Sequence, residues 1–244
     1  YNYLQKTISQ ENIYMNNTIM DKINGRPYGL RILYAALGLF IFAFGVYLTI
    51  QANVGLAPWD AFSMGVSYHV PLTYGDIVTL TGFVILAIDL LLKEKIGLGS
   101  ILDVCIVGKS VDLFTWLDIV PQLHNIWIGI PVLLAGLAIE AFAMGIYMAQ
   151  GLSCGPRDAL LVAMGKRLKK FPIGAVKMII DGFAVAIGFI LGAKVGIGTV
   201  VAVFGMGFIL QGAFKIMKFD ATAVTHESII GTVNRLRRIN ENTR

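Results

Sequence analysis

Six long apolar stretches recur along the chain, and they constrain its fold more than any other feature. They occupy residues 30–50, 76–92, 100–120, 126–149, 173–193 and 197–217. An α-helix needs about 20 mostly apolar residues to cross the hydrocarbon core of a bilayer. The whole chain is 56% hydrophobic and only 14% charged, which leaves too few polar side chains to cover a surface facing water. These patterns predict an all-α polytopic membrane protein with six transmembrane helices, and they exclude a soluble enzyme.

Basic residues are distributed unevenly over the connections between these stretches. Of the 20 lysines and arginines, 17 lie before or at the start of the first stretch, after the second, between the fourth and fifth, or at the end of or after the sixth. Cytoplasmic connections carry such an excess of basic residues. The pattern therefore predicts that both termini are cytoplasmic. It also assigns residues 1–28 to a polar tail and residues 219–244 to a basic amphipathic tail, which we expect to lie on anionic lipids of the inner leaflet.

Short motifs recur at an offset of 98 to 100 residues, which indicates an internal duplication. The matched segments are 44–48 with 144–148, 55–61 with 153–159, 64–65 with 164–165, 97–100 with 196–199, and 108 with 207. We assign residues 29–122 and 123–218 to two repeats of three spans each. Because three is an odd number, the second repeat must enter the membrane from the opposite face. This inverted arrangement is typical of many secondary transporters.

A proline and an aspartate follow the first span of each repeat. The two motifs are Pro58, Trp59 and Asp60 in the first repeat, and Pro156, Arg157 and Asp158 in the second. Proline at the first helical position and an acidic side chain in the first turn are typical of a helix N-terminus. The segments that follow are too short to cross a bilayer, so they predict a short broken, re-entrant or interfacial helix in each repeat.

These two motifs admit two interpretations. Broken helices at corresponding points of inverted repeats line the transport pathway in many transporters. Simple capping of interfacial helices explains the same residues equally well. Trp59 suits the membrane interface, and Arg157 fits either the excess of positive charge on the cytoplasmic side or a role in binding an anion.

A few charged side chains lie deep within the predicted spans. They are Lys109, Asp112, Glu140, Lys177 and Asp181. Each costs at least about 2.5–3.5 kcal/mol at the centre of a membrane helix, so these side chains are candidates to bind substrate or a coupling ion. The spacing also allows Lys109 to pair with Asp112 and Lys177 with Asp181, which would instead hold the helices together.

Counted along their spans, Lys109, Asp112, Glu140 and Asp181 fall at similar depths and predict a polar belt near the middle of the membrane. We expect Asp89 and Asp103, nearer the ends of their spans, at the interface.

Other site classes find little support in the sequence. Gly-x-Gly turns at 97–99 and 196–198 precede apolar spans and indicate helix starts rather than nucleotide binding. The three histidines lack metal-ligand spacing, and the two cysteines are expected at different depths. We therefore expect no cofactor, no metal, no enzyme activity and no nucleic-acid partner. The sequence leaves the oligomeric state open, a homo-oligomer included.

Residues 30–218 resemble the YczE/YyaS/YitT group of bacterial integral membrane proteins, and the YczE-like members most of all. The resemblance rests on the Pro58-Trp59-Asp60 motif, on the Gly-x-Gly turns followed by Ser100 and Thr199, and on the pattern of spans. It implies a multi-pass protein of the bacterial plasma membrane.

Two functions follow from these patterns as hypotheses. The first is a secondary transporter or facilitator of a small polar or ionic solute that works by alternating access between the repeats. The second is a membrane accessory or scaffold protein without transport activity, which would dock a partner enzyme through the basic residues of 157–170 and of the tail.

Overall fold

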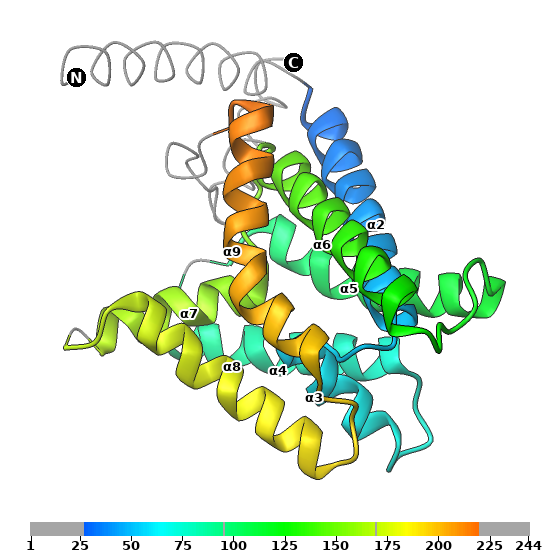
Figure 1. Ribbon diagram of the computed structural model, residues 1–244. Coiled ribbons are helices and arrows are strands. Elements are labelled where there is room, and N and C mark those ends of the chain that lie inside the picture. Colours follow the sequence, from blue (N-terminus) through cyan, green and yellow to red (C-terminus); the bar gives the residue numbers. More distant parts are fainter. Residues whose placement is uncertain (1–26, 95, 169, 220–244) are drawn as a thin grey trace, which may run out of the picture.

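The computed structural model describes residues 27–94, 96–168 and 170–219. The secondary structure of this part of the chain consists of helices joined by turns and short loops (Figure 1). Its helices are α2 (Tyr28–Gln51), α3 (Pro58–Ser67), α4 (Tyr74–Leu91), α5 (Leu98–Leu117), α6 (Ile126–Met148), α7 (Pro156–Arg167), α8 (Ile173–Ile190) and α9 (Ile197–Met217). Residues 1–26 and 220–244, which make up most of the two tails predicted at 1–28 and 219–244, lie outside the described residues.

Five of these helices are long and apolar enough to cross a membrane, namely α2, α4, α6, α8 and α9. This confirms a polytopic helical membrane protein. Helix α5 has 20 residues, but Asp103, Lys109 and Asp112 make it less apolar than the others. A sixth crossing by α5 therefore stays a prediction.

Helices α3 and α7 are the two short helices that the sequence predicts, and they contain 10 and 12 residues. Pro58 and Pro156 occupy their first positions, and Asp60 and Asp158 lie in their first turns. At 1.5 Å per residue, each spans only about 15–18 Å, well short of a bilayer core.

The helices form two groups, and each group contains helices from both halves of the chain (Figure 1). In the group that we term the long-helix bundle, α2 packs along α6, with α5 against α2 and α9 against α6. In the short-helix bundle, α3 packs on α8 and α7 on α4. Each bundle thus takes two helices from each half of the chain. Extensive packing of α4 on α5 joins the two bundles.

Small residues bring the helix backbones into close contact. A Cβ atom added at Gly45 of α2 would lie 2.8 Å from the carbonyl oxygen of Gly136 on α6, and one added at Gly136 would lie 2.8 Å from that of Gly45. Between α8 and α3, a Cβ atom at Gly188 would lie 2.5 Å from Ala61. Membrane helices gain stability from such close packing, because lipid supplies little hydrophobic drive for their association.

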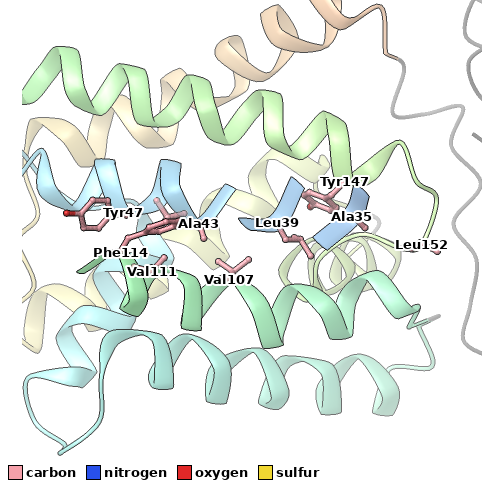
Figure 2. Packing of buried hydrophobic residues seen from close by; sticks show 10 residues of the cluster. Ala35, Leu39, Ala43, Tyr47, Val107, Val111, Phe114, Tyr147 and Leu152 are labelled. Carbon is pink, nitrogen blue, oxygen red and sulfur yellow. The ribbon is translucent and has the colours of Figure 1, made fainter. Parts of the chain in front are cut away.

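Apolar side chains of α2, α5 and α6 fill the interior of the long-helix bundle (Figure 2). Leu39 and Tyr47 of α2 are fully buried there, beside Phe114 of α5. The Tyr47 hydroxyl donates to the carbonyl of Val120, 2.8 Å away, and accepts from the Val120 amide at 2.9 Å. This pair of bonds fastens the end of α5 to α2.

Arg31, at the start of α2, is only 1% exposed. Its guanidinium donates through Nε and Nη2 to the Gln150 carbonyl oxygen just beyond the end of α6, at 3.0 and 2.5 Å. A cation at this point also complements the negative end of the helix dipole. Arg31 therefore fixes the register of α2 against α6.

Backbone conformation repeats along the chain at the offset of the sequence motifs. Every described residue with positive φ has such a counterpart, in the pairs Asn53 and Gly151, Gly55 and Ser153, Lys93 and Gly192, and Asp118 and Lys218. Within each pair the two residues are 98 to 100 positions apart. The turns of both halves thus share one backbone geometry, although only some of the positions carry glycine.

The unwound segments before α3 and α7 bind the turns before α9 and α5. The amide of Gly198 donates to the Val54 carbonyl at 2.9 Å, and the amide of Gly99 donates to the Leu152 carbonyl at 2.7 Å. Backbone groups in a membrane need such internal partners, because no lipid group satisfies them. These bonds hold each broken segment against the opposite half of the chain.

The close approach at Gly55 predicts a sensitive position. Alanine there would combine a φ of +128° with a Cβ atom 2.7 Å from the amide nitrogen of Gly196. We expect Gly55→Ala to destabilise the folded protein by roughly 2 kcal/mol or more, seen as a lower thermal unfolding midpoint in detergent. Gly29→Ala is the matched control, because an added Cβ meets nothing within 4 Å there. Equal midpoints for both variants would contradict the contact.

Candidate functional site

The two short helices begin next to each other near the middle of the molecule. The Arg157 guanidinium of α7 lies over the Trp59 ring of α3, with its carbon 5.2 Å from the ring centroid. This distance is typical of a cation–π contact. Trp59 and Arg157 are the middle residues of the two Pro-x-Asp motifs, and they are the residues by which the motifs differ. The two motifs therefore contact each other through these two side chains.

Four carboxyl groups surround Arg157 closely enough to interact with its charge. They are Asp60 of α3, Asp103 of α5, Glu140 of α6 and Asp158 of α7. Asp60 is 7% exposed and Glu140 is 8% exposed. The site thus takes one acid from each of four helices, and both bundles contribute.

Hydrogen bonds and packing hold these acids in place. The Tyr74 hydroxyl at the start of α4 donates to Asp60 Oδ1 at 2.8 Å. Glu140 lies where α6 crosses α2, and a Cβ atom added at Gly45 would come within 2.7 Å of its Cγ atom. The Gly45 position therefore leaves room for the carboxyl-bearing side chain between two tightly packed helices.

Lys177 and Asp181 form the ion pair that their spacing predicts, with Nζ 2.5 Å from Oδ2. Asp181 is 6% exposed, whereas the Lys177 side chain is 57% exposed. Both also interact electrostatically with Asp158. The pair thus extends the charged cluster from α7 onto α8.

Two small cavities meet at Arg157 and Asp158. One, of about 120 Å³, is lined by Asp103 and Tyr147 as well as by these two residues. The other, of about 130 Å³, is lined on its far side by Lys177 and Asp181. Each has room for a few water molecules or a small ion. Both cavities therefore adjoin Arg157, and each has charged side chains in its wall.

Acids outnumber bases in this group, which we term the arginine cluster. It contains Asp60, Asp103, Glu140, Asp158 and Asp181, together with Arg157 and Lys177. Full ionisation would leave three uncompensated negative charges within the protein. Unpaired buried charge is costly, so such a cluster takes up protons or a cation rather than an anion. No three potential metal ligands converge anywhere in the described ranges.

Lys109 and Asp112 lie elsewhere, and each has partners on α4 in place of the mutual ion pair that their spacing allows. Lys109 Nζ donates to Asp76 at 2.5 Å, while Asp112 accepts from the Thr73 hydroxyl and from the Gly75 amide. Both therefore join α5 to the beginning of α4. The unpaired donors of a helix N-terminus attract the Asp112 carboxylate, and sequence spacing alone does not reveal this long-range partner.

Two acids expected at the interface are covered by other parts of the protein, Asp103 partly and Asp89 fully. Asp103 lines the cavity beside Arg157, and Asp89 of α4 is fully buried with no hydrogen-bond partner within the described residues. Tyr74 and Asp103 are the members of the site that sequence reasoning missed. Tyr74 is the first residue of α4, the helix that follows α3, and this place in the sequence is the one feature that could have identified it.

Known proteins place this chain among bacterial membrane proteins. Residues 29–215 match the model of a family described as "Family of unknown function (DUF6198)". The chain is 30% identical over 187 residues to "Uncharacterized membrane protein YczE" of Bacillus subtilis, covering 75% of this chain and 84% of the relative. It is 27% identical over 194 residues to "Uncharacterized protein YyaS" of the same organism, covering 78% and 94%.

An "Uncharacterized protein" of Haemophilus influenzae is 24% identical over 189 residues, covering 75% of this chain and 85% of the relative. No solved structure matches the chain. The match spans every described helix almost completely, and it confirms the resemblance to YczE and YyaS. The chain belongs to the DUF6198 family of YczE-like membrane proteins.

Proposed function

We propose that this protein is a secondary transporter of a small cationic solute or of protons, working by alternating access between two inverted repeats. In this proposal α2 to α5 form one repeat and α6 to α9 the other, and six helices cross the membrane with both termini in the cytoplasm. The matched turns and the packing of the helices support a duplication. The packing of α2 on α5 corresponds to that of α6 on α9, and the packing of α3 on α8 corresponds to that of α7 on α4.

One difference between the halves carries the proposal. In the first half, Leu86 of α4 packs with Ile96 and with Val104 of α5 in a buried cluster. The corresponding residues of the second half, 99 positions later, are Val185, Val195 and Val203, and they line an open crevice between α8 and α9. The same three positions are thus closed in one half and open in the other.

Such asymmetry is what an alternating-access cycle requires. If the halves exchanged conformations, the α8–α9 crevice would close and an α4–α5 crevice would open at the opposite face of the membrane. The contacts of Lys109 with Asp76 and of Asp112 with Thr73 would then act as a latch on the closed pair. Because these contacts lie between two helices that would separate, they are suited to a gate.

The arginine cluster lies where the bundles meet, so either crevice would lead toward it. Its excess of acids supports uptake of a proton or a cation, and Glu140 and Asp181 are the acids for which we propose this role. Arg157 would then set the affinity by competing with the solute for the surrounding carboxylates. No enzymatic step enters this proposal.

The rival docking function gains less support. Lys166 donates to Glu94 at 2.7 Å, and Arg167 donates to the Leu92 carbonyl at 2.7 Å. These contacts draw two basic side chains of the 157–170 segment onto the end of α4. Lys166 and Arg167 are therefore engaged within the chain itself, and we favour transport.

Cross-linking tests the proposed cycle. In a cysteine-free background made with Cys105→Ser and Cys154→Ser, the pair Leu86→Cys and Val104→Cys should trap the α4–α5 contact. We expect oxidation to abolish proton uptake into proteoliposomes, measured with an entrapped pH dye under an imposed potential, and reduction to restore it. The single variants are the controls. Unchanged uptake with the cross-link formed would overturn the cycle.

Neutral variants test the acids. We expect Glu140→Gln and Asp181→Asn each to lower proton uptake at least tenfold, because each removes a negative charge from a poorly solvated site, while the amount of folded protein stays unchanged. Glu94→Gln is the matched control, since Glu94 lies at the end of α4 and pairs with Lys166. Full uptake by both neutral variants would contradict their assignment.

A further inference from the structure

The crevice between α8 and α9 is large enough for an organic molecule. Its volume is about 510 Å³, within the usual range for sites that bind small molecules. Gly182 and Ala186 of α8 form part of its wall, and Val200 and Val203 of α9 lie opposite. Val200 is 56% exposed and Phe189 is 65% exposed, so the crevice opens sideways, toward the lipid in our six-span arrangement.

The wall of this crevice is apolar except at Asp181 and Thr199. Thr199 is neutral, and its Oγ1 atom already accepts from the Gly196 amide, 3.2 Å away. Asp181 is therefore the group in this wall that can select a ligand by charge. Asp181 also lines the small polar cavity beside Arg157. Its carboxylate therefore lies at the junction between an apolar space and the charged interior.

The charges at this junction favour a cationic ligand. Asp181 belongs to the arginine cluster, in which five acids face two bases. Lys177, its ion-pair partner, has a 57% exposed side chain on a long flexible stem. A ligand cation could displace that ammonium group from Asp181. The long side chain of Lys177 would then carry its ammonium group to the membrane surface, where water solvates the charge.

Aromatic rings at the edge of the crevice add to this preference. Phe189 and Phe204 both line it and are 65% and 60% exposed. The faces of such rings attract organic cations, most strongly when water is excluded. An inorganic cation would gain nothing from the apolar walls, whereas a hydrophobic cation would bury its body there.

We propose that the α8–α9 crevice binds a hydrophobic organic cation, with its apolar body between α8 and α9 and its charge at Asp181. This inference names a ligand class for the transport pathway and rests on the proposed function. It adds that the ligand enters from the bilayer rather than from water. Lys177 occupies the charge site when the ligand is absent.

Equilibrium binding of radiolabelled tetraphenylphosphonium to the full chain in phosphatidylcholine nanodiscs tests this site. We expect Asp181→Asn to weaken binding about tenfold or more, because the ligand cation loses its charged partner. Lys177→Gln should strengthen binding, since it removes the competing ammonium group. A purely structural ion pair would make both variants behave alike, and a change of the same sign in both would overturn the proposal.

A steric variant tests the position independently of charge. Gly182 lines the crevice, and an added Cβ atom there meets nothing within 4 Å, so Gly182→Phe should fold and fill the space. We expect it to reduce tetraphenylphosphonium binding at least tenfold. Gly29→Phe is the matched control, because an added Cβ atom at Gly29 also meets nothing within 4 Å and Gly29 lies on α2, outside the crevice.

The outcomes separate this inference from the proposed function. Binding that follows the predicted signs without any flux of protons or tetraphenylphosphonium would support the site and remove the transport function. Proton flux without such binding would support transport and overturn the ligand class. Binding that is unchanged in Asp181→Asn and in Gly182→Phe would assign the crevice to lipid chains or a second copy, and would overturn the site.

Discussion

Backbone groups have no water to bind inside a bilayer, and the arrangement of this protein depends on how it meets that constraint. The chain unwinds after α2 and again after α6. At each place a carbonyl of the unwound segment accepts from a glycine amide at the start of a helix in the other half, with Val54 bound to Gly198 and Leu152 bound to Gly99. These bonds hold the segments from which the short helices α3 and α7 begin against the other half of the chain.

The short helices in turn bring charged side chains together. Their first turns place Trp59 beside Arg157, and acids from α5 and α6 approach the same guanidinium. A partly buried arginine without these acids, or the acids without the arginine, would carry a desolvation cost. The cluster is therefore a joint product of both halves, and its excess of acids is the basis on which we propose a cation or a proton as its ligand.

The difference between the halves has equal importance. Helices α4 and α5 pack closely, while α8 and α9 separate around an apolar crevice that ends at Asp181. Polar contacts of Lys109 and Asp112 strengthen the closed pair, and the α8–α9 pair has Gln211 at the position equivalent to Asp112. In the proposed cycle, the two halves would exchange these two arrangements.

The sequence by itself determined the elements: the bounds of the long helices, the short helix after each Pro-x-Asp motif, and the Lys177–Asp181 pair all follow from local periodicity, capping and spacing along one helix. Only the tertiary structure decided which charges meet. Lys109 pairs with Asp76 rather than with Asp112, and Asp103 lines a cavity together with Arg157. These contacts depend on how helices distant in the sequence cross, and packing of small residues such as Gly45 and Gly136 sets those crossings in ways that helical periodicity does not encode.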